Sequence, residues 1–133
     1  MSQADDLQRR AETFADKSIA FVQGLPKTMI AQRLGGQYLD ASTSVAANYR
    51  AARRGRSHDE FTAKLGIVSE EADECVFWLK RLATASITST VDGGPLLAEA
   101  EELAKIFGAS ARTARSRRRK RRPGDPEPRQ TQQ

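Results

Sequence analysis

Apolar residues recur at alternating intervals of four and three along the chain, and the pattern is most regular between residues 57 and 85. Its positions are Phe61, Leu65, Val68, Ala72, Cys75, Leu79 and Leu82. Because an α-helix has about 3.6 residues per turn, this spacing places all of them on one face and predicts a long helix over residues 59–85. Ser57 and Glu60, just before the apolar run, are typical of a capping box at the start of that helix.

Three further stretches carry the same period, at about residues 3–24, 27–54 and from 95 onward. Their apolar faces consist of Leu7, Ala11, Phe14, Ser18, Phe21 and Leu25 in the first, of Met29, Ile30, Leu34, Tyr38, Ala41, Val45 and Ala52 in the second, and of Leu96, Ala100, Leu103, Phe107 and Ala111 in the last. Gly24 and Pro26 separate the first two stretches, since glycine suits a helix end and proline a helix start. The pair Gly35–Gly36 weakens the second helix and would allow another backbone to pack closely on it. The small polar residues that follow, Ser42, Thr43, Ser44 and Asn48, favour a kink or local irregularity in this stretch.

Four amphipathic segments joined by short connections predict an all-α fold, an antiparallel up-down-up-down four-helix bundle. We expect residues 1–111 to form this bundle. Residues 112–133 are expected to be a basic, largely disordered tail, because like charges at successive turns oppose a helix and Pro123 and Pro126 interrupt any regular structure. Neutralisation of the basic run 115–122 would allow the last helix to extend into it.

Charge is unevenly divided along the chain. The 22 lysines and arginines exceed the 17 aspartates and glutamates, yet residues 111–133 hold nine of the basic groups and only two of the acidic ones. The remaining residues carry 13 basic and 15 acidic groups, so the body is close to neutral. Binding of a polyanionic partner would therefore depend on where the cations lie in the chain rather than on its net charge.

Composition and motifs exclude or disfavour several classes of protein. No run approaches the roughly 20 apolar residues that span a membrane, and the polar N-terminus lacks the order of a signal peptide. With Cys75 as the single cysteine and His58 as the single histidine, an intramolecular disulfide is excluded and a Cys/His zinc site lacks ligands. No nucleophile–base pair or glycine-rich phosphate loop is evident. We therefore expect a cytoplasmic, non-enzymatic protein with no catalytic residues, metal or cofactor.

The third stretch carries an acidic cluster, Glu70, Glu71, Asp73 and Glu74, beside its apolar face. Two carboxylates at helical spacing can bind a metal or serve as acid and base, but the Glu-x-x-His pairs of di-iron bundles are missing. The alternative, which we favour, is a polar seam that pairs with Arg or Lys of a neighbouring helix or subunit. Asn48, an amide on an apolar helix face, is expected to fix register or partner choice rather than to catalyse.

Aromatic residues outside the main apolar faces are candidates for a subunit contact. Trp78 lies off the main face of its stretch, beside Phe77, and we expect it to anchor the core or an interface. Tyr49 and Arg50 follow Asn48 and are expected to cross a subunit boundary. Cys75 lies on the apolar face, where we expect an inert core residue.

Two groups of cations are candidates for phosphate contacts. The first consists of Arg50, Arg53, Arg54, Arg56 and Lys64. A solvated helix end is an equally good interpretation of this group, because cations also favour the C-terminal end of the helix dipole. The second is the run Arg115, Arg117, Arg118, Arg119, Lys120, Arg121 and Arg122. For this run we favour nucleic acid over an acidic protein or an anionic lipid surface. Since no aromatic residues are interleaved, the contact would be largely independent of base sequence.

The central part of the chain also resembles a known family. The resemblance is carried by residues 42–52, STSVAANYRAA, residues 61–68, FTAKLGIV, residues 70–74, EEADE, and residues 77–79, FWL. Over about residues 5–108 the chain is similar to the small bacterial four-helix-bundle proteins, also called 23S rRNA intervening-sequence or S23 proteins. It departs from their pattern at Asp40–Ala41, where a basic residue and a serine are expected.

The resemblance implies a bundle that assembles into a ring of five subunits, with Asn48, Arg50 and Glu71 in one polar network. Family members encoded inside ribosomal RNA genes, and distant relatives that assist the reverse transcriptases of diversity-generating retroelements, imply a link to nucleic acid. We therefore expect a homo-oligomeric scaffold, a pentamer, that binds RNA or DNA and serves an RNA- or DNA-processing enzyme such as a reverse transcriptase. The alternative is an adaptor ring that binds a partner protein and no nucleic acid; neither involves a membrane.

Overall fold

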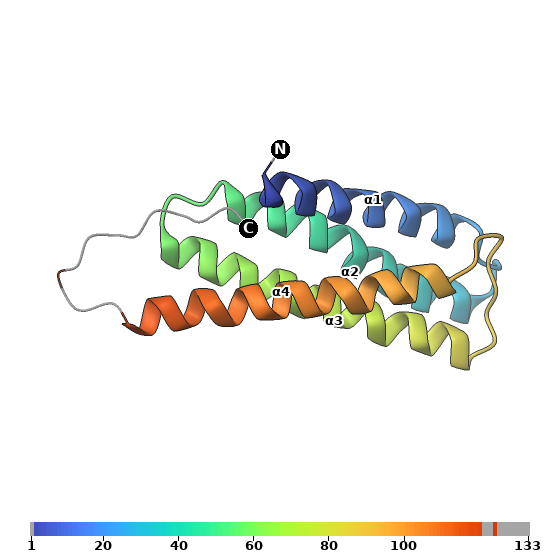
Figure 1. Ribbon diagram of the computed structural model, residues 1–133. Coiled ribbons are helices and arrows are strands. Elements are labelled where there is room, and N and C mark those ends of the chain that lie inside the picture. The colour runs from blue at the N-terminus through green and yellow to red at the C-terminus, as the bar shows by residue number, and fades with distance from the viewer. Residues whose placement is uncertain (1, 121–123, 125–133) are drawn as a thin grey trace.

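Four α-helices and no strand make up the regular secondary structure of the computed structural model, which describes residues 2–120 and Gly124, without the side chains of residues 119 and 120. The helices are α1 (Gln3–Gln23), α2 (Met29–Arg53), α3 (His58–Thr84) and α4 (Gly94–Lys120) (Figure 1). The predicted all-α, four-helix fold is confirmed. The helix ends that the sequence predicts within residues 1–111 lie one or two residues from the observed ones, or coincide with them.

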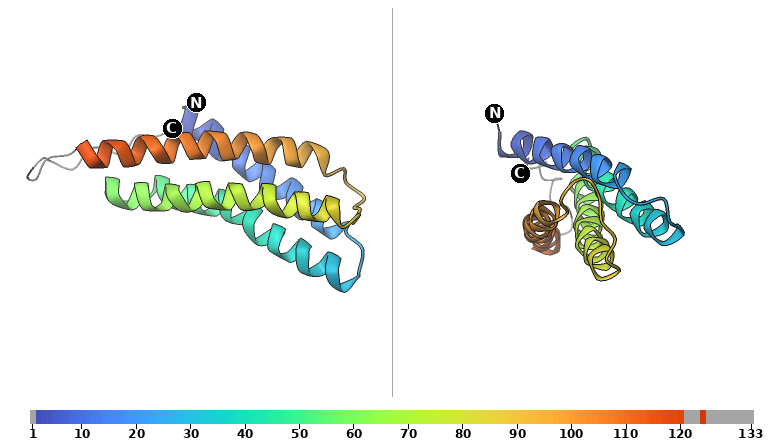
Figure 2. Two further views of the ribbon diagram at one scale, coloured as in Figure 1. Left: turned by 90° about the horizontal axis from the view of Figure 1, so that it is seen from below. Right: turned by 90° about the vertical axis from the view of Figure 1, so that its right-hand side faces the viewer.

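Consecutive helices run antiparallel and pack in the order α1, α2, α3, α4. Helix α3 packs along α2 on one side and along α4 on the other, whereas α1 lies mainly on α2 and meets α4 at few points. The α1–α2 pair diverges from the α3–α4 pair toward the end where α2 begins (Figure 2). The helices are therefore closest together toward the end where α2 leads into α3.

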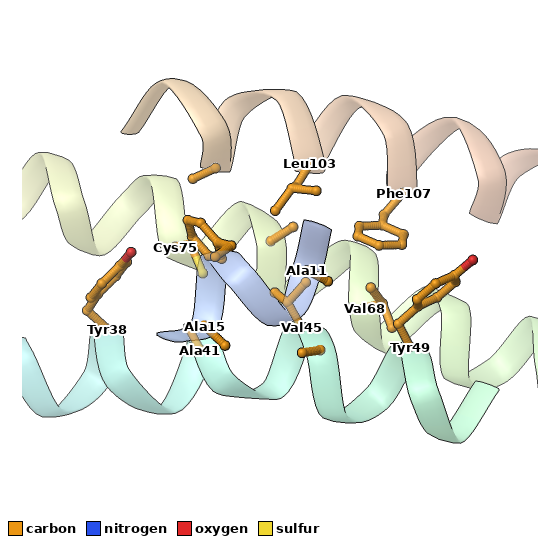
Figure 3. Packing of buried hydrophobic residues seen from close by; sticks show 14 of the residues in the cluster. Ala11, Ala15, Tyr38, Ala41, Val45, Tyr49, Val68, Cys75, Leu103 and Phe107 are labelled. Atoms are coloured by element: carbon orange, nitrogen blue, oxygen red, sulfur yellow. The ribbon is translucent and has the colours of Figure 1, made fainter. Parts of the chain in front are cut away.

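The predicted apolar faces meet in one core (Figure 3). On α3 every predicted position from Phe61 to Leu82 is at most 4% exposed. Tyr38 is fully buried, and its hydroxyl lies 2.6 Å from Ser18 Oγ, so these two core hydroxyls satisfy each other. Met29 and Ile30 are exceptions to the prediction, at 69% and 54% exposed, because they occupy the first turn of α2 where the helix pairs diverge.

Helix α2 is uninterrupted through Gly35 and Gly36 and on to Arg53, so the break in helical structure that a local irregularity would cause is not observed. A Cβ atom at Gly35 would lie 2.6 Å from Leu25 Cδ1, whereas one at Gly36 would meet open space. The absence of a side chain at Gly35 therefore lets the connection after α1 pack closely on α2, and that packing offsets the lower helix propensity of glycine.

Side chains cap both α1 and α3. Ser57 Oγ accepts a hydrogen bond from the backbone N–H of Glu60 at 3.1 Å, as the sequence predicted. The carboxylate of Glu60 accepts from the N–H of Arg56 at 2.7 Å, one residue earlier than a capping box requires. A complete capping box, which the sequence analysis did not identify, is formed by Ser2 and Asp5 at the start of α1.

Helix α4 continues to Lys120, so the bundle boundary predicted at residue 111 falls inside a helix, and residues 112–120 of the predicted disordered tail are helical. The apolar face of α4 extends one more turn, because Ala114 is 4% exposed. Ala114 continues the spacing of Leu103, Phe107 and Ala111, so the predicted apolar face ended one turn too early. Residues 121–123 and 125–133 of the predicted tail lie outside the described residues.

Candidate nucleic-acid interface

Cations from three elements gather at one end of the bundle. Because neighbouring helices are antiparallel, the end of α2, the start of α3 and the end of α4 lie together (Figure 1). The exposed cations there, which we call the basic end, are Arg50, Arg54, Arg56, Lys64, Arg112, Arg115, Arg117 and Arg118. Arg112, the first residue of the predicted tail, was not among the sequence candidates, which in this part of the chain begin at Arg115.

The last four cations of the predicted run lie at or beyond the limit of the described residues. Arg119 and Lys120 belong to α4, but their side chains are outside the described part of the structure. Arg121 and Arg122 lie outside the described residues altogether.

Two contacts attach the end of α4 to the start of α3. His58 is 3% exposed, and its Nε2 lies 3.1 Å from the carbonyl oxygen of Ala114. One turn further on, Arg118 Nε lies 3.1 Å from Asp59 Oδ1. This ion pair is about half exposed and contributes little to the stability of the fold by itself. Together with the buried histidine, it fixes the direction in which α4 leaves the bundle. The last turns of α4 project beyond the start of α3 (Figure 2).

Arg53, a predicted phosphate contact, is used by the fold instead. One terminal nitrogen of its guanidinium donates to the carbonyl oxygen of Ala4 and to Gln8 Oε1, both at 3.1 Å. The other donates to Asp5 Oδ1 at 2.8 Å, and the side chain is only 14% exposed. Arg53 thus connects α2 to the start of α1, and we leave it out of the basic end.

Replacing Asp5 with Asn should lower Tm at neutral pH and have little effect in strong acid. Hydrogen bonds from Arg53 and Ser2 hold the pKa of Asp5 below its ordinary value of 3.8. A carboxyl group with a lowered folded-state pKa stabilises the fold above its unfolded-state pKa, and this stabilisation disappears as the pH falls through the folded-state value. Thermal unfolding across pH tests this, with D6N as the control for an exposed neighbour. A D5N deficit that does not change with pH would contradict the assignment.

Polar residues of α2 and α3 form a second group, on the seam between these helices. Glu71 lies close to Ser44 of α2 and to Glu74 of its own helix. Partial burial and the adjacent Glu74 raise the pKa of Glu71, while the Ser44 hydroxyl opposes the rise. Glu74 Oε1 lies 3.4 Å from Trp78 Nε1, and Asn48 donates to the carbonyl oxygen of Ser44 at 3.0 Å. Together these polar side chains form a strip along the contact between α2 and α3.

Two residues predicted beside this group lie elsewhere. Tyr49 is 1% exposed and packs against Phe107, with ring centroids 5.0 Å apart, so it belongs to the core of the bundle. Arg50 is two residues from Asn48 and therefore points to another side of α2. It lines a polar hollow of about 300 Å³ beside Gln8 of α1. In the bundle, Arg50 is thus separated from the seam that holds Asn48 and Glu71.

Apolar side chains are exposed along the outside of α3. Ile67 is 40% and Phe77 is 48% exposed. Trp78 is half-buried and meets Phe77 edge-on, with ring centroids 4.8 Å apart, and the Arg81 guanidinium lies 5.1 Å from the centroid of the Phe77 ring. We call the surface formed by Ile67, Glu70, Glu74, Phe77 and Trp78 the outer α3 face. Exposed apolar groups that share one surface favour contact with another molecule.

The described residues offer little for metal chemistry or membrane insertion. No three His, Cys, Asp or Glu side chains in this part of the chain are arranged to hold a metal ion. None of the four helices is long and apolar enough to cross a membrane. Cys75 is buried, and burial raises the pKa of its thiol, which keeps it in the unreactive protonated form.

Comparison with known proteins gives a family and a fold. The sequence profile described as 23S rRNA-intervening sequence protein matches residues 5–109. A crystal structure of a protein with unknown function from the S23 ribosomal protein family, from Bacteroides thetaiotaomicron, matches with a TM-score of 0.68 and 20% identity over 84% of this chain and 99% of that chain. At this identity the match shows a shared fold. No curated protein matches the sequence. Since the profile covers most of its length, the chain belongs to the 23S rRNA-intervening sequence protein family.

Proposed function

We propose that the protein is a non-enzymatic, self-assembling scaffold that binds nucleic acid through phosphate contacts at its basic end. The observation that carries this proposal is the meeting of exposed cations from α2, the α2–α3 connection, α3 and α4 at one end of the bundle. Arginine guanidinium groups match phosphate oxygens in charge and geometry. The attached, projecting end of α4 supports the proposal further, because it presents its cations on an ordered element.

Self-association is proposed to use the outer α3 face. Ile67, Phe77 and Trp78 supply apolar area of the kind that is enriched in subunit contacts. Several copies in one assembly would bring several basic ends together and raise the affinity for a polymer by avidity. A ring of five subunits is the assembly that the family resemblance implies. The enzyme served would be one that acts on nucleic acid, such as a reverse transcriptase.

Replacing Ile67 with Lys should reduce the molecular mass in solution toward the 14.7 kDa of one chain. A buried lysine without a partner opposes association, and loss of apolar area weakens the contact. I19K is a matched control, because Ile19 is 39% exposed but lies on α1. Light scattering on both variants checks this. Equal masses for I67K, I19K and the wild type would exclude the outer α3 face as the contact.

The proposed binding has a second readout that is independent of assembly. Phosphate contacts release counterions, so the logarithm of the affinity should fall linearly with the logarithm of the salt concentration. Fluorescence anisotropy with labelled RNA and DNA over a salt series measures this slope. The absence of binding to both polymers at low salt would contradict the nucleic-acid role and favour the adaptor that binds only a partner protein.

A further inference from the structure

The cations of the basic end form two separate clusters rather than one continuous surface. Arg50, Arg54 and Arg56 belong to the end of α2 and the connection that follows it, with Lys64 close by on α3. The second cluster lies on α4 and consists of Arg112, Arg115, Arg117 and Arg118. Helices α2 and α4 each pack along α3 and have no close backbone contact with each other, although their side chains Tyr49 and Phe107 meet in the core.

Acidic groups occupy the space between the two clusters. Asp59 and Glu60 are exposed in the first turn of α3. Asp59 faces α4 through its ion pair with Arg118, and Glu60 faces the other cluster through its hydrogen bond with the Arg56 N–H. A phosphate chain that ran directly from one cluster to the other would therefore pass two carboxylates.

The separation of the clusters allows each of them to reach a different row of phosphates. Packed helices have axes about 8–10 Å apart, so α2 and α4, which both pack on α3, are separated by roughly 11–20 Å. The two grooves of B-form DNA are about 6 and 12 Å wide. Flexible arginine side chains on α2 and α4 can therefore each reach one backbone, with the acidic turn of α3 facing the groove between them.

The basic end also lacks a surface for stacking exposed bases. Its aromatic residues His58, Phe61, Tyr49 and Phe107 are all at most 4% exposed. The exposed ring of Phe77 lies some 19 residues further along α3, which is about 28 Å of helix. Proteins that bind single strands without sequence preference usually combine cations with stacking aromatic residues, and this arrangement is missing among the described residues of the basic end.

We propose that the ligand of the basic end is double-stranded nucleic acid, held across one groove by the α2 cluster on one strand and the α4 cluster on the other. This inference rests on the proposed function and names the structural class of the polymer. Because the contacts are to phosphates, duplex RNA and duplex DNA are both accepted, with no strong dependence on base sequence.

The test compares a duplex with an oligothymidine that has the same number of phosphates, each bound to the full-length protein. We expect the duplex to bind at least about tenfold more tightly at moderate salt. Two sets of substitutions probe the clusters, R50Q/R54Q/R56Q on one side and R115Q/R117Q/R118Q on the other. Each set should reduce the salt slope for the duplex by about 3. Far-UV circular dichroism controls for loss of helix.

Several results would overturn the inference, and they distinguish its failure from the failure of the proposed function. Equal affinity for duplex and oligothymidine, or a duplex slope that only one set of substitutions changes, contradicts binding across a groove but leaves nucleic-acid binding intact. Absence of binding to either polymer contradicts the proposed function itself. A twofold or smaller effect of both sets on duplex affinity at low salt would likewise exclude the two clusters as the binding surface.

Discussion

A chain that ends at Arg115 should lose most of its affinity for nucleic acid and keep its fold. The deletion removes seven of the 22 basic groups together with the projecting turns of α4. If about four of these cations contact phosphates, counterion release predicts a loss of roughly a hundredfold to a thousandfold near physiological salt. Anisotropy titration measures the loss, and circular dichroism with thermal unfolding checks the bundle.

The end point of this deletion follows from the structure. Ala114 is buried and its carbonyl oxygen accepts from His58, so a chain that ends at residue 111 would lose core packing as well as charge. A chain that ends at Arg122 is the matched control, because it keeps the basic run and removes only the residues after it. Unchanged affinity in the shorter chain would move the binding site to the α2 cluster or exclude the basic end.

Replacing Phe107 with Ala should lower the free energy of unfolding by about 3–5 kcal/mol, because a fully buried ring leaves a cavity that the surrounding helices fill only in part. Phe107 projects from α4 toward Val68 of α3 and Tyr49 of α2, so its removal weakens the contacts of three helices (Figure 3). Urea unfolding followed by circular dichroism measures the change at one fixed protein concentration.

Two further variants keep this prediction testable if F107A does not fold. F107L retains part of the volume and should lose about 1–3 kcal/mol. M29A removes an apolar side chain that is 69% exposed and should stay within about 0.5 kcal/mol of the wild type. Similar losses for M29A and F107A would contradict the position of the core described above.

The fold could be predicted because local spacing carries it. The regular intervals from Phe61 to Leu82 identify α3 and its buried face without any tertiary information. The same method failed at Met29 and Ile30, which have the right spacing but lie where α2 begins and no helix covers them. Spacing indicates which residues share a face, but not how far along a helix that face remains covered.

The candidate site was less predictable because its contacts are non-local. In the sequence, Arg53 is one of several neighbouring arginines, and only the fold brings it to Asp5, 48 residues away. The extension of α4 depends likewise on His58 and Asp59, which are far from it in the chain. Like charges at successive turns destabilise a helix in isolation. The two contacts with His58 and Asp59 stabilise the end of α4 against this repulsion.

The most direct test of the central claim is the solution mass of the full-length protein, measured by light scattering with and without a nucleic-acid duplex at low and at moderate salt. We expect a mass several times 14.7 kDa, near five subunits, that increases when duplex is added at low salt and returns to its starting value as salt is raised. A mass of 14.7 kDa that no duplex changes at either salt concentration would contradict both the assembly and the binding.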